Sequence, residues 1–111
     1  DIGMMDERYF LYFEEQDWQF VARDKGHKNE LATDSIIYHK GSVSTNSKKH
    51  LFFYYYNRSA ILFSRKHYSS FTAFIASVML LGITIIRTKP NLESMKWGIK
   101  GMTEAWKSSN T

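Results

Sequence analysis

The pattern of hydrophobic and polar positions divides the chain into a mixed first part and a helical second part. In the first part, Trp18, Val21 and Ala22 recur at the three- and four-residue spacing of a helix. Acids precede them, where the positive end of a helix dipole favours negative charge, and Gly26 is a typical stop. We therefore expect a helix over residues 14–25.

Two short segments after this helix predict β-strands. Residues 28–33 and 35–39 flank a turn at Asp34, and the second contains the β-prone run Ile36-Ile37-Tyr38. Residues 41–47 are small and polar, which is typical of a loop. We place the main boundary there, between an N-terminal part (1–47) and a helical C-terminal extension (48–111).

The second part predicts three helices, over residues 48–68, 69–86 and 90–107. The last begins at Pro90, and its predicted apolar face comprises Leu92, Met95, Ile99, Met102 and Trp106. The expected fold class is therefore α+β and mostly α, with two short strands followed by about three helices.

Residues 68–86 contain no charged side chain, although serine, threonine and glycine interrupt the apolar run. Their length approaches the roughly 20 residues that cross a bilayer. Two interpretations compete: a membrane-embedded helix, or a helix that is buried in a small bundle or lies on a membrane surface. We favour the second, because the polar residues weaken the tendency to insert.

Charge is distributed unevenly. Residues 1–34 carry nine acids against four bases, a net charge of −5, whereas residues 35–111 carry eleven bases against two acids, a net charge of +9. A basic, aromatic-rich tail can face phosphates or an anionic membrane, but it can also be an ordinary soluble surface. No nucleic-acid-binding motif is present, and the acidic first part argues against that partner.

The run Phe13-Glu14-Glu15-Gln16-Asp17-Trp18 is the strongest candidate for a site. It places three carboxylates between large aromatic residues, where like charges are costly unless a cation or a proton offsets them. Such a cluster can supply a general base, but acids also commonly decorate the start of a helix. Glu14 and Asp17 share a helix face, and Glu15 points to one side.

The chain has no cysteine, which excludes disulfides, thiolate metal sites and cysteine nucleophiles. His39 follows the second predicted strand, and neutral imidazole is a common metal ligand. One histidine cannot hold a metal ion alone. Any further ligands must come from outside this chain or from a bound phosphate.

Taken together, these residues form a pattern that resembles the C-terminal part of glycosyltransferase family 2, especially its rhamnosyltransferase-like members. The pattern comprises Gly3, Asp6-Glu7, Tyr9-Phe10, Tyr12, Glu14-Glu15, Asp17-Trp18, Arg23, Gly26, Ile37-Tyr38-His39, Gly41, Ser42 and Ser44. The segment 53–58 is similar to the helical extension that follows in those proteins. The resemblance implies a GT-A-like nucleotide-sugar-binding fold and an inverting, single-displacement reaction.

The resemblance also implies roles for particular residues. Glu15 matches the catalytic base, with Glu14 as the alternative, and Glu14, Asp17 and Trp18 match the acceptor side of the site. His39 matches a histidine that helps to hold a divalent cation, Mg²⁺ or Mn²⁺, on the donor diphosphate. The nucleotide-binding strands and the Asp-x-Asp-like metal motif of the family are missing from this sequence, so we expect a C-terminal fragment that is inactive alone.

The leading hypothesis is thus part of an inverting glycosyltransferase of surface polysaccharide synthesis. Its partners would be a nucleotide-sugar donor and a saccharide or lipid-linked acceptor, and its location the cytoplasm or the inner face of a bacterial membrane. The alternative is a basic, aromatic helical module that docks on an anionic membrane surface or a protein. Apolar surface and strand edges without partners predict that the fragment self-associates.

Overall fold

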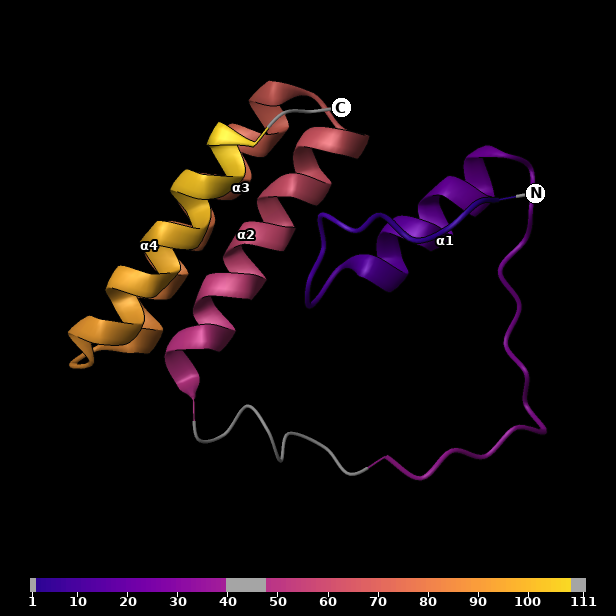
Figure 1. The fold of residues 1–111 in the computed structure, drawn as a ribbon, viewed down its shortest axis with the longest axis horizontal. Coiled ribbons are helices and arrows are strands. Elements are labelled where there is room, and N and C mark those ends of the chain that lie inside the picture. The colour runs from indigo at the N-terminus through magenta and orange to yellow at the C-terminus, as the bar shows by residue number, and fades with distance from the viewer. Residues whose placement is uncertain (1, 40–47, 109–111) are drawn as a thin grey trace.

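A computed structural model describes residues 2–39 and 48–108 of the chain. Within these residues the regular elements are four α-helices: α1 (Glu14–Asp24), α2 (Lys49–His67), α3 (Ser70–Thr88) and α4 (Leu92–Lys107). Figure 1 shows that α2, α3 and α4 pack side by side as a bundle. Helix α1 and the segment before it are not part of this bundle. They contact α2 through side chains.

The closest helix pair is α2 and α4, which approach through small residues. Ser94, Gly98, Gly101 and Ala105 are spaced at three and four residues along α4, and all are buried. A Cβ atom on Gly101 would collide with the backbone carbonyl of Tyr54 in α2. A helix that presents no side chain at these positions can lie directly against its neighbour, so glycine is required there.

A buried amide connects all three helices of the bundle. The Asn57 Nδ2 group in α2 donates to the Thr84 hydroxyl in α3 at 2.8 Å and to the Gly98 carbonyl in α4 at 3.4 Å. Asn57 is almost fully buried, so these bonds replace the water that its amide loses on folding. This polar contact fixes which faces of α3 and α4 turn inwards.

Side-chain caps begin the last two helices. The Ser69 hydroxyl accepts a hydrogen bond from the Thr72 amide at 3.2 Å, and the Asn91 side chain accepts one from the Ser94 amide at 3.0 Å. These bonds satisfy amides that have no partner within the first turn. Short connections with such caps return the chain sharply, which keeps successive helices adjacent.

The N-terminal segment and α1 dock on α2 through aromatic rings and backbone carbonyls. Phe20 of α1 packs edge-on against Phe63 of α2, with ring centroids 5.0 Å apart. The Ser59 hydroxyl donates to the Leu11 carbonyl at 2.9 Å, and Arg58 donates to the carbonyl of Arg8 at 2.7 Å. These contacts bring α1 to the end of α2 although more than twenty residues separate the two helices in sequence.

The predicted α+β class is wrong: the described residues contain only helices and no strand. Residues 28–39, where two strands were expected, are exposed and irregular, and Ile36, Ile37 and Tyr38 project into solvent. A β-strand needs a neighbouring strand to pair its backbone groups, and the described chain supplies none. The GT-A-like sheet implied by the resemblance is therefore not built by residues 2–39 and 48–108.

The helices themselves are confirmed, with ends shifted by one or two residues from those predicted. The predicted loop at residues 41–47, with its boundary between two parts and its hydroxyl side chains at Ser42, Ser44, Thr45 and Ser47, lies outside the described residues. Of the apolar face predicted for α4, Met102 is buried in the core, whereas Leu92 is largely exposed. Small residues make the closest contact with α2.

Substitution of Gly101 by alanine tests the close approach of α2 and α4. We expect Gly101→Ala to lower the free energy of unfolding by about 1–3 kcal/mol, because the added methyl group must push the helices apart. The matched control is Gly82→Ala in α3, where an added Cβ meets no atom within 4 Å. The control should gain about 0.5–1 kcal/mol from alanine's helix propensity. Urea unfolding monitored by circular dichroism measures both free energies. Equal effects of the two substitutions would contradict the close packing of α4 on α2 at Gly101.

Candidate functional site

The candidate site lies at the start of α1, where the backbone adopts an unusual conformation. Tyr12 and Phe13 have φ angles of 68° and 67°, in the left-handed region that bulky residues rarely enter. Their rings are held by α2: Tyr12 packs against Phe52 at a centroid distance of 5.4 Å, and Phe13 against Phe63 at 5.5 Å. Strained backbone persists only where its surroundings fix it, and it is common at functional sites.

No side chain caps the start of α1, and its first turn carries Glu14, Glu15 and Asp17 instead. Negative charge stabilises this position because the amides of the first turn leave a partial positive charge there. The three carboxylates nevertheless occupy different surroundings. Asp17 is buried, Glu14 is half-buried and Glu15 is exposed.

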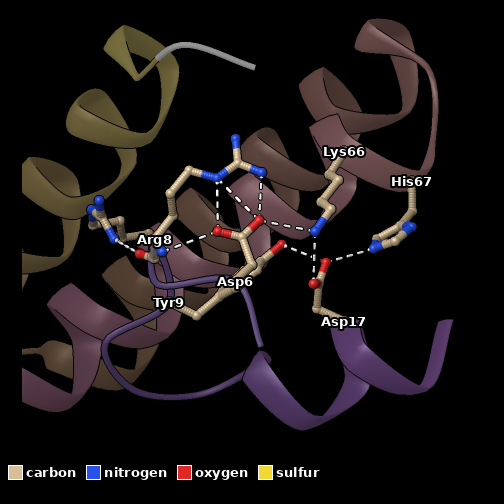
Figure 2. A network of polar contacts seen from close by, with 7 residues as sticks. Asp6, Arg8, Tyr9, Asp17, Lys66 and His67 are labelled. Carbon is tan, nitrogen blue, oxygen red and sulfur yellow. Dashed lines mark hydrogen bonds and ion pairs between the residues drawn. The ribbon is translucent and has the colours of Figure 1, made fainter. Parts of the chain in front are cut away.

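Asp17 is the centre of a buried polar network (Figure 2). Only 2% of its side chain is exposed. Its Oδ2 atom accepts a hydrogen bond from Lys66 Nζ at 2.7 Å, and its Oδ1 atom lies 2.6 Å from His67 Nε2. The Tyr9 hydroxyl donates to the same Oδ1 atom at 3.1 Å. Both carboxylate oxygens are thus occupied by side chains of the protein.

The network continues to a second carboxylate. Lys66 Nζ lies 2.9 Å from Asp6, and Arg8 binds the same carboxylate with an N···O distance of 2.6 Å. The hydrogen bonds from Arg8, followed by those from Lys66, hold the pKa of Asp6 well below its usual range despite partial burial. Figure 2 shows Lys66 between the two aspartates, so a single ammonium group links the N-terminal segment to α1.

Tyr9 is held in its neutral form. Burial, and then the negative charge of Asp17, raise the pKa of the Tyr9 hydroxyl far above its ordinary value. The hydroxyl therefore remains a hydrogen-bond donor to Asp17. Tyr9, Lys66 and His67 together offset the cost of burying one carboxylate.

Glu14 and Trp18 line a surface cavity of about 500 Å³ together with residues of the segment before α1. The Trp18 indole nitrogen donates to the carbonyl of Gly3 at 3.0 Å, which fixes the plane of the ring. One oxygen of Glu14, Oε2, is covered and has no hydrogen-bond partner among the described residues. A covered carboxylate oxygen without a donor is costly, and Glu14 borders the cavity, so a ligand hydroxyl that reached this atom would relieve that cost.

Glu15 does not line the cavity of Glu14. It lines a second cavity of about 390 Å³, which Trp18 shares and to which Gln19, Lys28 and Glu30 also contribute. The Glu15 side chain is exposed, so its carboxylate is open to a bound molecule. Trp18 and Met5 thus line the cavities of both glutamates.

His39 lies apart from these cavities. It is exposed at the end of the irregular segment and lines neither cavity beside Trp18. Among residues 2–39 and 48–108, no three His, Asp or Glu side chains are placed to hold one metal ion together. The residues described here therefore do not fit a complete Mg²⁺ or Mn²⁺ site, and a metal-binding role for His39 stays a prediction that needs ligands from elsewhere.

The structure brings together two of the predicted acceptor-side residues, Glu14 and Trp18, and places Glu15 beside them. It places Asp17 in the buried network instead. The residue that the sequence pattern missed is His67, whose side chain is only 8% exposed and binds Asp17. The absence of acids between residues 35 and 92 was a usable signal, because any cation buried there must find its carboxylate elsewhere.

Comparison of the chain with models of known protein families, with curated proteins and with solved structures gives no match.

The Asp6 carboxylate provides a test by pH. Because its pKa is lowered in the folded state, the stabilisation that it contributes is complete above the ordinary carboxyl pKa of about 4. That stabilisation is lost as the pH falls from there towards the lowered value. We expect Asp6→Asn to be less stable than the parent chain at neutral pH and to lose less stability on acidification. Urea unfolding at a series of pH values measures both effects.

The control is Asp34→Asn, which alters an exposed carboxylate in the irregular segment. It should leave the pH dependence close to that of the parent. If Asp6→Asn and the parent lose stability in parallel below pH about 4, the ion pair with Arg8 is not responsible for acid sensitivity.

Proposed function

We propose that this chain is the C-terminal part of an inverting glycosyltransferase and contributes the acceptor side of its site. The proposal rests on the resemblance of residues 2–47 to glycosyltransferase family 2 and on the surroundings of the α1 acids. It includes no strand of the sheet that the resemblance implied. The acceptor would be a saccharide or a lipid-linked saccharide of surface polysaccharide synthesis, and the donor a nucleotide sugar.

The observation that carries the proposal is the covered Glu14 oxygen without a partner beside the fixed ring of Trp18. Sugars present hydroxyl groups that donate hydrogen bonds and C–H faces that pack on aromatic rings. A carboxylate with one unpartnered oxygen and an indole whose orientation is fixed border one cavity of about 500 Å³, and a sugar bound there would meet both kinds of contact. We assign Glu14 to an acceptor hydroxyl and Trp18 to the sugar face.

Glu15 is assigned to the base. In a single displacement the acceptor oxygen forms a bond to the anomeric carbon, the bond from that carbon to the donor diphosphate breaks, and the acceptor proton passes to a carboxylate. The carboxylate of Glu15 is exposed and borders a cavity that shares Trp18 and Met5 with the cavity of Glu14, so an acceptor that spans both cavities can bring a hydroxyl to it. General-base catalysis of this kind contributes about 10²–10⁴-fold to a rate.

Asp17 is assigned a positioning role. Three side chains already bind its two oxygens, and only 2% of its side chain is exposed, so a hydroxyl in either cavity beside Trp18 does not reach it in this arrangement. By fixing α1 on the end of α2, Asp17 sets the direction in which Glu14 and Glu15 leave the first turn of the helix.

The proposal is tested in the complete polypeptide that it implies. We expect Glu15→Gln to lower kcat for sugar transfer by about 10²–10⁴-fold with a small change in KM, because the amide binds but accepts no proton. The fall in rate at acid pH, where the base is protonated, should also disappear. Transfer of labelled sugar across a range of pH measures both.

Asp34→Asn is the matched control, since it removes an exposed carboxylate that lines neither cavity. It should transfer sugar at the parent rate. Near-normal transfer by Glu15→Gln with an unchanged pH profile would refute the assignment of the base. If Glu14→Gln alone removed the acid limb, the base would be Glu14.

A further inference from the structure

Helix α3 exposes its large apolar side chains and buries its small polar ones, the reverse of a helix in a soluble bundle. Ser77, Thr84 and Thr88 face inwards and are buried. The outward residues include Phe71, Phe74, Val78, Met79 and Ile86, with exposed fractions of 71%, 58%, 56%, 62% and 75%. Only 22% of the most apolar part of α3 is buried, so the bundle does not enclose this helix.

Hydrogen bonds hold α3 in this orientation. Thr84 accepts a bond from Asn57 of α2 at 2.8 Å, and Ser77 accepts one from the Trp106 indole of α4 at 2.9 Å. Rotating α3 to hide its apolar face would break both bonds. The buried Asn57 amide would lose its acceptor on Thr84 and keep only the longer bond to Gly98. The apolar surface is therefore a fixed feature of the fold.

The outward apolar residues recur at positions 71, 74, 75, 78, 79 and 86, which form one stripe along the helix. The stripe continues on to α4 through a groove of about 550 Å³. Phe74 and Val78 line it from α3, and Ile99 and Trp106 line it from α4. The apolar face is thus wider than one helix.

Cations stand at both ends of this face. Arg87 and Lys89 are exposed at the C-terminal end of α3, and Lys107 is exposed beside Phe74 near its N-terminal end. Within the described part of the chain none of the three forms an ion pair, and no acid occurs between residues 35 and 92. A second copy of this chain would bring cations against cations, whereas an anionic lipid surface complements them.

We propose that the outer face of α3, with Arg87, Lys89 and Lys107 at its ends, docks on an anionic lipid bilayer with α3 lying along the surface. A crossing orientation is excluded by α4, which packs beside α3 and exposes Lys96 and Lys100 in its middle. Crossing would carry those lysines into the hydrocarbon. A helix lying flat buries the apolar stripe while the cations meet the headgroups. This inference goes beyond the proposed sugar transfer and stands on different residues.

Flotation with vesicles tests the docking. The probes are phosphatidylcholine vesicles with and without phosphatidylglycerol, and the protein is the 111-residue chain. We expect binding to vesicles that contain phosphatidylglycerol, weakened by salt, and little binding to phosphatidylcholine alone. Each of Arg87→Gln and Lys89→Gln should weaken binding about fivefold, the equivalent of roughly 1 kcal/mol per cation near a charged membrane.

The apolar contact is tested by Met79→Asp, whose side chain lies in the outward stripe and 62% exposed. It should weaken binding by about tenfold or more, because methionine burial is lost and a charge enters the interface. Gln16→Asp is the matched control, since it adds the same charge at an exposed position on α1. It should bind close to the parent level, and circular dichroism should show both variants equally helical.

The depth of α3 in the bilayer is measured with a fluorophore attached at position 78 of the variant Val78→Cys. Because the parent chain has no cysteine, the fluorophore labels this position alone. A helix on the surface places this position at shallow depth, so lipids with a quencher near the glycerol should quench more than lipids with a quencher near the chain end. Stronger quenching by the deep label would overturn the flat orientation. Equal flotation with neutral and anionic vesicles, or a stable dimer of the parent chain that binds neither, would overturn the proposal.

Discussion

The buried carboxylate of Asp17 is the contact on which the arrangement of the N-terminal half depends. No sheet joins this half to the bundle in the described residues, and α1 makes few backbone-level contacts with the other helices. Lys66 and His67 at the end of α2 both bind Asp17, and Tyr9 binds it from the segment before α1. Burial of such a group is costly, so its main effect is to select one arrangement rather than to add stability.

The bundle is governed by a different constraint, the close approach of α2 and α4. Glycine and other small residues of α4 let its backbone lie close to α2. Asn57 of α2 donates hydrogen bonds to both α3 and α4. These polar and small contacts use the inward face of α3 and leave its large apolar residues outside. The outward apolar face is therefore a consequence of how the core is built.

The sequence predicted what depends on local pattern. The helical spacing, the acids before Trp18 and the stop at Gly26 located α1, and the remaining helices followed from periodicity and from breakers such as Pro90. The prediction of two strands was wrong because residues 28–39 have β-prone composition but no neighbouring strand among the described residues. Strand pairing depends on two segments, so the composition of one segment does not determine it.

Contacts between residues far apart in the sequence could not be predicted from the local pattern. Large apolar residues were expected to form the inner face of α4, but Gly98 and Gly101 pack more closely than any of them. At the site, residues 14–18 were located as a unit, whereas their division into buried Asp17, half-buried Glu14 and exposed Glu15 was not. That division follows from His67 and Lys66, which lie about fifty residues away in sequence.

The most direct test of the role of Asp17 is a distance measurement between α1 and the bundle. Because the chain has no cysteine, spin labels can be placed at Gln19→Cys on α1 and Ser70→Cys at the start of α3, both exposed positions. If Asp17 fixes α1 on α2, pulsed electron paramagnetic resonance should give one narrow distribution of distances between the two labels. Adding Asp17→Asn should broaden this distribution while the helix content of the bundle persists. A distribution that remains equally narrow with Asp17→Asn would contradict the claim that this carboxylate holds the two halves together.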